Sequence, residues 1–304
     1  MAELTVARRY RLDPEAVRAR LRRRRTLDLV RKGGRTLITF ALGFLFLMPF
    51  IWMFATSLKI DPEVYRVPPT WLPRVVRWEN YSEAMTYEPF GLYFVNTLKY
   101  GLSATVGAVL SSALCAYGFS RVQWKGRDTV FWVVLSTMMI PGQVRMIPLF
   151  LIFKRIGWLD TYLPLVIPSY LGSAYFIFMM RQFFMTIPTE LSDAARIDGC
   201  SELGIFFRII LPLSRSALVV VGLFRFMDAW NDYMGPLIYL RDIDKYTVAM
   251  GLQHLRQYGQ AASPEQYWPH LMAAASVVTV PIVIMYFFTQ RTFVEGIALT
   301  GVKG

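Results

Sequence analysis

The chain contains 304 residues, of which 55% are hydrophobic and only 18% are charged, and its formal net charge is +12. A soluble chain of this length usually carries about a quarter charged residues, so the composition argues against an ordinary soluble enzyme. Two cysteines and two histidines are too few for a disulfide framework or a Cys/His zinc site, and we expect no metal site. No apolar run follows Met1 until Leu37, so a secretory signal is not expected.

Residues 1–35 form a basic tail with 12 Lys or Arg and 4 Asp or Glu, so two thirds of the net charge lies in this segment. Asp13 can cap a helix that begins at Pro14, and the arginine-rich stretch 18–25 follows. A basic helix beside a membrane span is attracted to anionic lipid head groups. Nucleic-acid binding would need a folded reader domain, which is absent here, so we expect lipid and no nucleic acid as a partner.

Hydropathy predicts six membrane spans. A transmembrane helix needs about 20 apolar residues to cross about 30 Å of hydrocarbon. Four stretches of that length contain no Asp, Glu, Lys or Arg, namely 36–58, 100–118, 162–180 and 268–290. Two further stretches, 129–153 and 209–240, are apolar but interrupted by charged residues. The sequence therefore predicts an all-α, polytopic membrane protein with six transmembrane helices, whose membrane domain covers residues 36–290.

The distribution of Lys and Arg between the loops predicts the orientation of these spans. If residues 1–35 are cytoplasmic, the loops and tails on that side hold 21 basic residues, and the loops on the other side hold 9. Because basic loops tend to stay in the cytoplasm, both termini are expected there, including the tail 291–304. The long loop 185–212 is then cytoplasmic as well.

The span 100–118 is rich in small side chains, with Gly, Ala, Ser or Thr at 11 of its 19 positions. Ala104, Ala108, Ser112 and Ala116 fall four residues apart on one helical face. Small residues at this spacing let helix backbones approach closely in lipid. The pattern indicates close packing, either inside one helical bundle or around a transport pathway.

The cytoplasmic loop contains a short helix whose two ends are visible in the sequence. Thr189 is an acceptable N-cap, and Glu190 lies in the first turn, where a carboxylate suits the helix dipole. Gly199 can end the helix with a positive φ, and Ser201 can cap the helix that follows. An ordinary surface elbow would leave this pattern unexplained. A short helix held below the membrane by a rigid turn predicts a docking element.

This loop resembles the EAA signature of the permeases of ATP-binding-cassette (ABC) importers. The residues that match the signature are Glu190, Ala194, Ala195, Asp198, Gly199, Phe206, Leu211 and Pro212. The family more often has Glu where this chain has Asp193, and Ala where it has Cys200. Both departures are mild, because Asp keeps the charge with a shorter reach and Cys is nearly as small as Ala.

The resemblance covers nearly the whole chain after residue 36 and points to the carbohydrate-uptake branch, in which the chain resembles the maltose-system G subunit. Matching motifs include T-S-L-K at 56–59, A-Y-G-F-S-R at 116–121, M-I-P-x-Q-V at 139–144 and W-N-D-Y-x-x-P-L at 230–237. Parts of the chain are also similar to glycerol-phosphate permeases. The ordered set of motifs agrees with the six spans counted from hydropathy.

The resemblance implies a type I ABC importer permease in the cell (plasma or inner) membrane, forming half of the pathway for a sugar or related solute. The implied partners are a second, non-identical permease, two cytoplasmic ABC ATPases and an extracytoplasmic solute-binding protein. The chain has no G-x-x-x-x-G-K-S/T P-loop, so we expect it to be no enzyme and to bind no cofactor. ATP and Mg would be bound by the partner ATPase.

The resemblance also assigns coupling roles within the loop. Glu190 is expected to approach a basic residue of the ATPase, and Ala194 and Ala195 to form a close-packed contact face. Asp198 and Gly199 are expected to hold the turn. The full coupling set implied in this way is Glu190, Asp193, Ala194, Ala195, Asp198, Gly199, Phe206 and Pro212.

Charged residues at membrane depth are costly and are therefore candidates for function. Arg225, Asp228 and Asp232 lie at i, i+3 and i+7 of one predicted helix. They form either an internal ion pair between Arg225 and Asp228 or part of the pathway lining. Trp230, Asn231 and Asp232 would suit a sugar site, which typically offers an aromatic face and amide or carboxylate groups. The W-N-D sequence is also a landmark of the family and can equally be structural.

Prolines are expected to distort the two interrupted spans. Arg145 lies between Pro141 and Pro148, where a kink is expected, and Pro236 should bend the span 209–240. If Arg145 faces the pathway, it would favour an anionic or phosphorylated solute. If it snorkels to head groups or contacts another helix, it says nothing about the solute, and this second interpretation is favoured.

Three other classes of membrane protein are alternatives to an importer permease. One is a pure scaffold subunit that lines no pathway, and the sequence does not separate it from a permease. A secondary transporter not driven by an ATPase would often show inverted repeats and more spans, and it would leave the EAA-like loop unexplained. A membrane-embedded hydrolase would need a nucleophile with a base, or metal ligands, at membrane depth. The sequence shows no internal repeat, no Ser-His pair and no H-E-x-x-H arrangement.

Overall fold

The computed structural model describes residues 14–262 and 267–301, with side chains described for residues 28, 31–257 and 267–290. Every regular element in these ranges is a helix and they contain no strand, in agreement with the all-α prediction. The chain divides into two compact units, Met1–Ala55 and Thr56–Gly304.

The first unit consists of most of helix α2 (Pro14–Ser57), which is 44 residues long. The helix begins at Pro14, as predicted. Backbone N–H groups in the first turn of a helix have no carbonyl partner within it, so a proline, which has no N–H, is tolerated there. The predicted cap, Asp13, lies outside the described residues. The part Arg31–Ser57 is long and apolar enough to cross a membrane. The basic tail and the first span thus share one uninterrupted helix from Pro14 onward.

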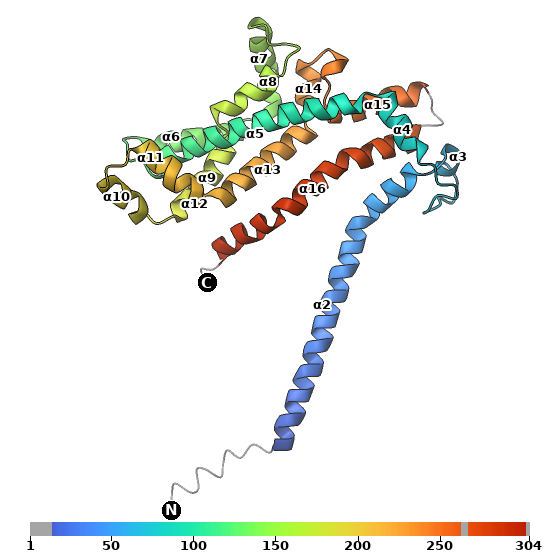
Figure 1. Ribbon diagram of the computed structural model, residues 1–304, viewed down its shortest axis with the longest axis horizontal. Coiled ribbons are helices and arrows are strands. Elements are labelled where there is room, and N and C mark those ends of the chain that lie inside the picture. The colour runs from blue at the N-terminus through green and yellow to red at the C-terminus, as the bar shows by residue number, and fades with distance from the viewer. Residues whose placement is uncertain (1–13, 263–266, 302–304) are drawn as a thin grey trace, which may run out of the picture. The chain divides into compact units, whose positions relative to one another are not determined.

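The second unit contains the remaining helices, coloured from pale blue to red in Figure 1. In chain order they are α3 (Asp61–Val64), α4 (Glu79–Tyr87), α5 (Phe90–Ser120), α6 (Arg127–Ser136), η2 (Thr137–Met139), α7 (Gly142–Arg155), α8 (Leu163–Val166), η3 (Ile167–Leu171), α9 (Ala174–Thr186), α10 (Glu190–Ile197), α11 (Glu202–Ile205), η4 (Phe206–Ile210), α12 (Leu211–Leu213), α13 (Arg215–Asn231), α14 (Met234–Tyr239), η5 (Ile243–Lys245), α15 (Val248–Ala262) and α16 (Tyr267–Gly301).

Helix α5 provides the main packing surface of the second unit. It packs against α13, α9 and η3, and α13 in turn packs against α16 (Figure 1). The four small residues at spacing four, Ala104, Ala108, Ser112 and Ala116, are all buried. Small side chains allow helix axes to approach closely in lipid. This face of α5 is therefore closely packed, as both interpretations of the pattern require.

Four of the six predicted spans overlap stretches that are long and apolar enough to cross a membrane. These are Arg31–Ser57, Phe90–Ser120, Leu163–Thr186 and Tyr267–Gln290. The other two are helix pairs bent at a break. Arg127–Met139 meets Gly142–Arg155 at 96°, and Glu202–Leu213 meets Arg215–Asn231 at 80°. The described residues thus offer four spans, or six if each bent pair counts as one span.

Pro141 produces the bend in the first pair. The preceding residue, Ile140, is extended, with φ −81° and ψ 113°, because a proline ring excludes the helical region for the residue before it. Pro148, by contrast, lies inside α7 without ending it. The kink expected between these two prolines is therefore located at the first of them.

The span predicted over 209–240 is divided by a break in its first part. Pro212 has no N–H to donate within a helix, and the π-helical turn η4 directly precedes α12, the helix that contains it. The chain then bends by 80° between α12 and α13, at Ser214. The helical stretch that crosses the second unit begins only at Arg215.

The same stretch ends earlier than predicted, at Asn231. The backbone of Asp232 is no longer helical, with a ψ of 110°. Its carboxylate accepts the N–H of Gly235, in the first turn of α14, at 2.9 Å. Pro236 consequently lies buried in α14 and does not bend a span, contrary to the prediction. A side chain that accepts a nearby backbone N–H offers the chain an alternative to continuing the helix.

Gly107 should be essential for the contact between α5 and η3. A Cβ at Gly107 would lie 2.4 Å from the ring of Tyr170, whereas a Cβ at Gly118 on the same helix would have no atom within 4 Å. Gly107→Ala should destabilise the fold by about 1–3 kcal/mol, the usual cost of overpacking, and Gly118→Ala should not. Thermal unfolding of the purified protein in detergent compares the two variants. Equal melting temperatures would contradict this packing.

Candidate coupling site and solute pathway

Helix α10 is a short helix that ends in a defined turn. Gly199 has a φ of +80°, as predicted, a conformation that glycine adopts without strain. The N–H of Gly199 donates to the carbonyl of Arg196 at 3.0 Å, and the N–H of Cys200 donates to that of Ala195 at 2.9 Å. These two hydrogen bonds form a Schellman motif, which satisfies carbonyls at the helix end and sets the direction in which the chain leaves it.

Of the two residues predicted to cap a helix, Ser201 makes a capping hydrogen bond and Thr189 does not. Ser201 caps α11 as predicted, since its Oγ accepts the N–H of Gly204 at 3.2 Å. Thr189 occupies the N-cap position of α10, but its side chain makes no capping hydrogen bond. Its backbone is already helical, with φ −69° and ψ −29°, whereas a capping residue typically has an extended backbone. Glu190 and Asp193 supply the negative charge of the first turn.

A set of polar residues, here called the brace, holds α10 against the end of α5; its members are Tyr117, Arg121, Asp193, Arg196 and Glu202. The guanidinium of Arg196 donates to the carboxylates of Asp193 and Glu202, both at 2.7 Å, and to the carbonyl of Arg121 at 3.4 Å. The other carboxylate oxygen of Glu202 accepts the hydroxyl of Tyr117 at 2.5 Å. Hydrogen bonds between charged groups are among the strongest in proteins, so the brace restricts the movement of α10.

Arg121 extends the brace to α9. Its buried guanidinium donates to the carbonyl oxygens of Phe184 and Ile187, where α9 ends. A cation at this position is stabilised by the unpaired carbonyls and by the helix dipole. The brace therefore connects α10 directly to the ends of both α5 and α9.

The sequence analysis did not identify the brace. Tyr117 and Arg121 belong to the A-Y-G-F-S-R motif, but their partners Glu202 and Phe184 lie 85 and 63 residues further along the chain. Neither periodicity nor spacing indicates which distant residue a side chain meets. The A-Y-G-F-S-R motif was the only signal in the sequence, and it does not indicate which residues Tyr117 and Arg121 contact.

The two alanines of the expected contact face have different environments. Ala194 is exposed, whereas Ala195 is only 6% exposed and belongs to the hydrophobic core around α5 and α9. The expectation that both form one contact face is therefore wrong for Ala195. The reason is geometric, because successive residues point about 100° apart around a helix.

Phe206 and Pro212 complete the predicted coupling set and also lie in different environments. Phe206 is buried, and its ring centroid lies 5.2 Å from that of Tyr117. It therefore supports the attachment of α11 to α5 from inside the core. Pro212 is exposed, two residues before the 80° bend.

The outward surface of α10 combines carboxylates with large apolar side chains. Glu190, Leu191 and Asp198 are exposed, and Ile197 is 86% exposed at the last position of the helix. Apolar side chains that fill a pocket of a partner protein contribute much of the binding energy in protein interfaces. A helix held by the brace and presenting Ile197 in this way is suited to enter a cleft on another protein.

Arg225 is half-buried in α13 and is bonded to η3. Its guanidinium donates to Oγ of Ser169 at 3.1 and 3.3 Å and lies 5.9 Å from the ring centroid of Tyr100. Within the described side chains Arg225 forms no ion pair with Asp228, which is exposed, so the ion-pair interpretation is wrong. The hydrogen bonds of Arg225 thus go to a neutral group beside the small-residue helix α5.

Asp232 and Asn231 are occupied at the end of α13. The carboxylate of Asp232 accepts the hydroxyl of Tyr100 and the N–H of Gly235, each at 2.9 Å. The amide of Asn231 donates to the carbonyl of Met227 at 2.9 Å, although its side chain remains exposed. Asp232 therefore holds the turn into α14, while Asn231 is accessible.

Trp230 does not offer an aromatic face to a solute. It is 3% exposed, and its ring centroid lies 5.8 Å from that of Phe94 and 5.6 Å from that of Phe226. The expectation that it would suit a sugar site is wrong, because this position of α13 faces the core shared with α5 and α16.

Arg145, the other arginine considered for the pathway, is exposed on α7. Among the described residues it is not hydrogen-bonded to Arg225, whose guanidinium donates to Ser169.

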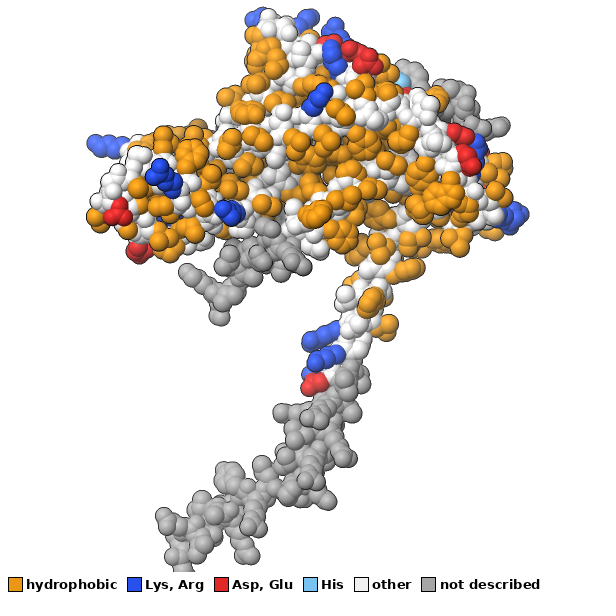
Figure 2. Space-filling model, in the orientation of Figure 1, with side chains coloured by type: hydrophobic (Ala, Val, Ile, Leu, Met, Phe, Trp, Pro, Cys, Tyr) orange, Lys and Arg blue, Asp and Glu red, His pale blue; other side chains and the backbone are white. Residues whose placement is uncertain are grey.

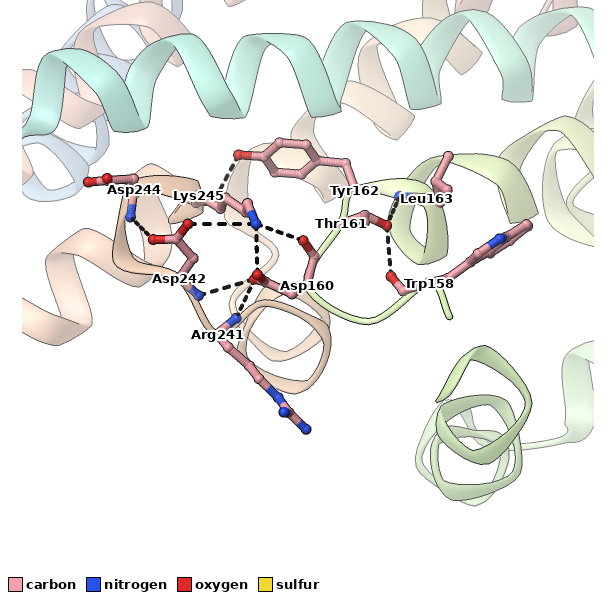
Figure 3. A network of polar contacts seen from close by, with 9 residues as sticks. All are labelled: Trp158, Asp160, Thr161, Tyr162, Leu163, Arg241, Asp242, Asp244 and Lys245. Atoms are coloured by element: carbon pink, nitrogen blue, oxygen red, sulfur yellow. Dashed lines mark hydrogen bonds and ion pairs between the residues drawn. The ribbon is translucent and has the colours of Figure 1, made fainter. Parts of the chain in front are cut away.

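A second polar network joins the loop between α7 and α8 to the loop after α14 (Figure 3). The carboxylate of Asp160 accepts Nζ of Lys245 at 2.7 Å and the N–H groups of Arg241 and Asp242 at 3.0 and 3.1 Å. The hydroxyl of Tyr162 donates to the carbonyl of Lys245 at 2.8 Å. Asp160 itself has a φ of +59°, which is uncommon for a residue with a side chain.

These contacts lower the pKa of Asp160 to about 2, chiefly through the hydrogen bond from Lys245 and then through those from the backbone. A carboxylate whose pKa is lower in the folded state stabilises the fold above its unfolded pKa of about 4. The stabilisation is lost as the pH falls from that value toward 2.

Both histidines pair with glutamates near the start of α5, which the sequence analysis did not predict. Nδ1 of His254 in α15 lies 2.5 Å from Oε1 of Glu88, whose other oxygen accepts the hydroxyl of Tyr93 at 2.9 Å. Nε2 of His270 in α16 lies 2.8 Å from Oε2 of Glu83 in α4. Among the described residues no group of His, Cys, Asp or Glu could hold a metal ion.

Comparisons with known proteins agree with this architecture. The family of binding-protein-dependent transport system inner membrane components matches residues 107–298. The inner membrane ABC transporter permease protein YcjP of Escherichia coli is 36% identical over 263 residues, which cover 85% of this chain and 91% of YcjP. The arabinooligosaccharides transport system permease protein AraQ of Bacillus subtilis is 33% identical over 275 residues, covering 88% of this chain and 95% of AraQ.

A third relative, the sn-glycerol-3-phosphate transport system permease protein UgpE of Pectobacterium atrosepticum, is 33% identical over 257 residues, which cover 83% of this chain and 90% of UgpE. Among solved structures, a chain of a bacterial ABC transporter involved in the import of the acidic polysaccharide alginate has a TM-score of 0.73 at 23% identity, covering 87% of this chain and 96% of that one. At this identity the likeness shows the fold, which is that of a type I ABC permease.

The turn at Gly199 should be sensitive to any side chain. A Cβ there would have no atom within 4 Å, so the cost of a substitution comes from the positive φ alone, about 1–2 kcal/mol for an ordinary residue. Gly199→Ala should therefore weaken the turn of α10, and Gly199→Asn should weaken it less, because Asn tolerates this conformation. Protease sensitivity of the 185–212 loop in the purified protein measures the effect. Gly142→Ala, at a helical glycine with equally open surroundings, is the control and should change nothing.

Asp160→Asn should remove an acid-dependent contribution to stability. The carboxylate contact is present above pH 4, so the variant should melt at a lower temperature than the parent protein at pH 7. The difference should shrink as the pH is lowered from about 4 toward 2, where the parent carboxylate becomes protonated. Asp244→Asn, at an exposed carboxylate of the same loop, should show no such change. A difference for Asp160→Asn that does not vary with pH would refute the charged role of this residue.

Proposed function

Because this chain belongs to the family of binding-protein-dependent transport system inner membrane components, we propose that it forms half of the membrane pathway for a carbohydrate or related solute. As a member of that family it is a permease subunit of an ABC importer and lies in the inner membrane. The family consists of transport permeases and not of enzymes, so the energy for transport is supplied by other subunits.

The observation on which the proposal rests is the braced helix α10. Its Schellman turn and the contacts of Arg196 hold it in one orientation, while Glu190 and Ile197 face outward. We infer that α10 enters a cleft of a separate ABC ATPase. Ile197 fills an apolar part of that cleft, and Glu190 approaches a basic residue. ATP and Mg are bound by this ATPase, of which two copies serve the two permeases of one importer.

The brace supports a direct transmission of movement. Since Arg121 is bonded to the end of α9 and lies at the end of α5, closure of the two ATPases moves α10, α5 and α9 together. This displacement opens the pathway to one side of the membrane and closes it to the other. A second, homologous permease supplies the other half of the pathway. A loop without the brace would absorb the movement instead of transmitting it.

The proposed orientation places α10 in the cytoplasm, together with the basic tail 1–35 and the tail 291–304. The start of α5, with the network of Asp160, then faces the outside. A solute-binding protein delivers solute there. One structure with this fold, at a TM-score of 0.62 and 16% identity, is a bacterial alginate ABC transporter in complex with an alginate-pentasaccharide-bound periplasmic protein. In this arrangement each bent helix pair counts as one of six spans.

The relatives support a carbohydrate or its phosphate as the solute, since AraQ is named for arabinooligosaccharides and UgpE for sn-glycerol-3-phosphate. Within the chain, Arg225 is the first candidate for contact with the solute. It is half-buried on α13, and its hydrogen bonds go to the neutral Ser169, so its charge can serve hydroxyl or phosphate oxygens. Asp228 and Asn231 are exposed on the same helix and are further candidates.

Ile197→Asp tests the docking role of α10. The residue is 86% exposed, so the substitution should leave the fold intact. It should lower the amount of P-loop ATPase that co-purifies with the tagged chain about tenfold or more, because a charge in an apolar cleft costs at least 1.4 kcal/mol. Purification from native membranes in mild detergent, with partners identified by mass spectrometry, measures the loss.

Ile243→Asp, at an exposed isoleucine of η5, is the matched control and should retain the ATPase. Glu190→Lys should weaken the same contact through reversed charge. Recovery of the unaltered chain without any ATPase, in a detergent that preserves other ABC complexes, would overturn the proposal. It would favour a secondary transporter instead.

A further inference from the structure

The segment that follows the first span, residues 59–78, has a polar interior and an apolar exterior; it is called the platform below. Inside it, Lys59 and Glu63 are buried together with Asn80 of the adjoining helix α4. On its outside lie seven exposed apolar or aromatic side chains, namely Tyr65, Val67, Trp71, Leu72, Val75, Val76 and Trp78. This is the reverse of a loop that faces water, whose polar groups are usually outside.

Hydrogen bonds within the interior give the platform a defined structure. Nζ of Lys59 donates to the carbonyl of Thr70 at 2.5 Å, and the Oγ1 of Thr70 donates to the carboxylate of Glu63 at 3.1 Å. The same carboxylate accepts the N–H of Arg74 at 2.9 and 3.2 Å. The buried charges of Lys59 and Glu63, together with their hydrogen-bond partners, thus hold the backbone of the platform in place.

Further hydrogen bonds tie both ends of the platform to the end of α2. The N–H of Arg77 donates to the carbonyl of Leu58 at 2.9 Å. The amide of Asn80 donates to the carbonyls of Ser57 and Lys59 at 2.8 and 2.9 Å. The exposed apolar side chains are therefore carried on a rigid base directly beside the last turn of a candidate span.

The exterior of the platform is both apolar and positively charged. Val67 is 90% exposed and Leu72 is 71% exposed. Arg66 and Arg74 are exposed among these apolar residues, whereas residues 64–78 contain no Asp or Glu. Patches of exposed apolar side chains mark surfaces that contact another protein or a membrane, and the arginines favour an anionic contact.

The platform lies at the end of the second unit opposite α10. Helices α3 and α4 pack against the first part of α16, near the start of α5 (Figure 1). Figure 2 shows hydrophobic side chains over this end of the molecule, with basic and acidic ones among them. Because Phe90 and Tyr267 begin candidate spans, this end lies at the boundary between hydrocarbon and water. Tyr and Trp side chains are enriched at this depth of a membrane.

We propose that the platform binds the head-group layer of the lipid bilayer, on the face of the membrane opposite α10. Its apolar and aromatic side chains enter the layer below the phosphates, and Arg66 and Arg74 contact anionic phosphate groups. The platform thereby holds the ends of α2 and α16 at a constant depth. The inference goes beyond transport of solute and does not depend on which solute is carried.

A bilayer explains the apolar exterior better than a soluble partner protein does. A partner that binds and leaves in each cycle would expose seven apolar side chains to water in between, at a cost of about 25 cal/mol for each Å². The bilayer is always present beside a span, so the same surface stays covered. Arginine side chains also suit this site, since their apolar stems can lie among acyl chains while the guanidinium reaches the phosphates.

Spin labels can test the depth of the platform in the assembled importer. A label at Leu72→Cys, in a background with Cys115→Ala and Cys200→Ala, is placed in nanodiscs of phosphatidylethanolamine and phosphatidylglycerol. The ratio of collision rates with oxygen and with a water-soluble nickel chelate rises with depth in lipid. The ratio at position 72 should be several-fold higher than at Asp244→Cys, an exposed position in the polar loop of Figure 3. Replacing Arg66 and Arg74 by Gln should reduce the ratio in anionic nanodiscs.

Two results would overturn the proposal. One is a ratio at position 72 equal to that at position 244. The other is a ratio that rises at position 72 only after the solute-binding protein is added, which would assign the platform to that protein. Quenching by brominated lipids provides a second measurement without the cysteine background. It should be larger for the unmodified chain than for Trp71→Phe, and equal quenching would count against lipid contact.

Discussion

Helices in lipid gain little hydrophobic free energy by associating, so this bundle depends on how closely its helices can approach α5. Ala104, Ala108, Ser112 and Ala116 form a buried face of small side chains along that helix. Gly107 lies so near Tyr170 that no Cβ fits between them. The close contacts with α9, α13 and η3 follow from this one surface, and they make α5 the common support of the second unit.

Both ends of α5 use polar contacts to hold the chain segments to which we assign roles in transport. Near Ser120, Tyr117 and Arg121 belong to the brace that holds α10, the proposed coupling helix. Near Phe90, the amide of Asn96 donates to the carbonyls of Asp244 and Tyr246 at 2.8 and 3.1 Å, which holds the loop after α14. One helix therefore connects the proposed ATPase contact to the proposed side of solute entry. The polar residues lie at its ends, where they can be paired without crossing the hydrocarbon.

The comparisons separate what the fold determines from what it leaves open. Relatives named for arabinooligosaccharides and for glycerol phosphate share about a third of their residues with this chain, and the fold also resembles that of an alginate importer subunit. Fold alone therefore does not select the solute, which must be chosen by a few side chains at the pathway. We propose Arg225 as the first candidate, because Trp230 is buried and Asp232 is occupied by Tyr100 and Gly235.

The sequence by itself determined the features that depend on neighbouring residues: the long apolar stretches, the start of α2 at Pro14, the turn at Gly199 and the cap at Ser201. Each follows from local backbone conformation or from hydropathy, and the family motifs are equally local. Only the tertiary structure decided that Ala195 and Trp230 are buried, that the stretch 209–240 breaks at Ser214 and again after Asn231, and that Arg121 joins three helices. These outcomes depend on which helix face meets which neighbour. Residues as far apart as Tyr100 and Asp232 make those contacts, and no periodicity in the chain encodes them.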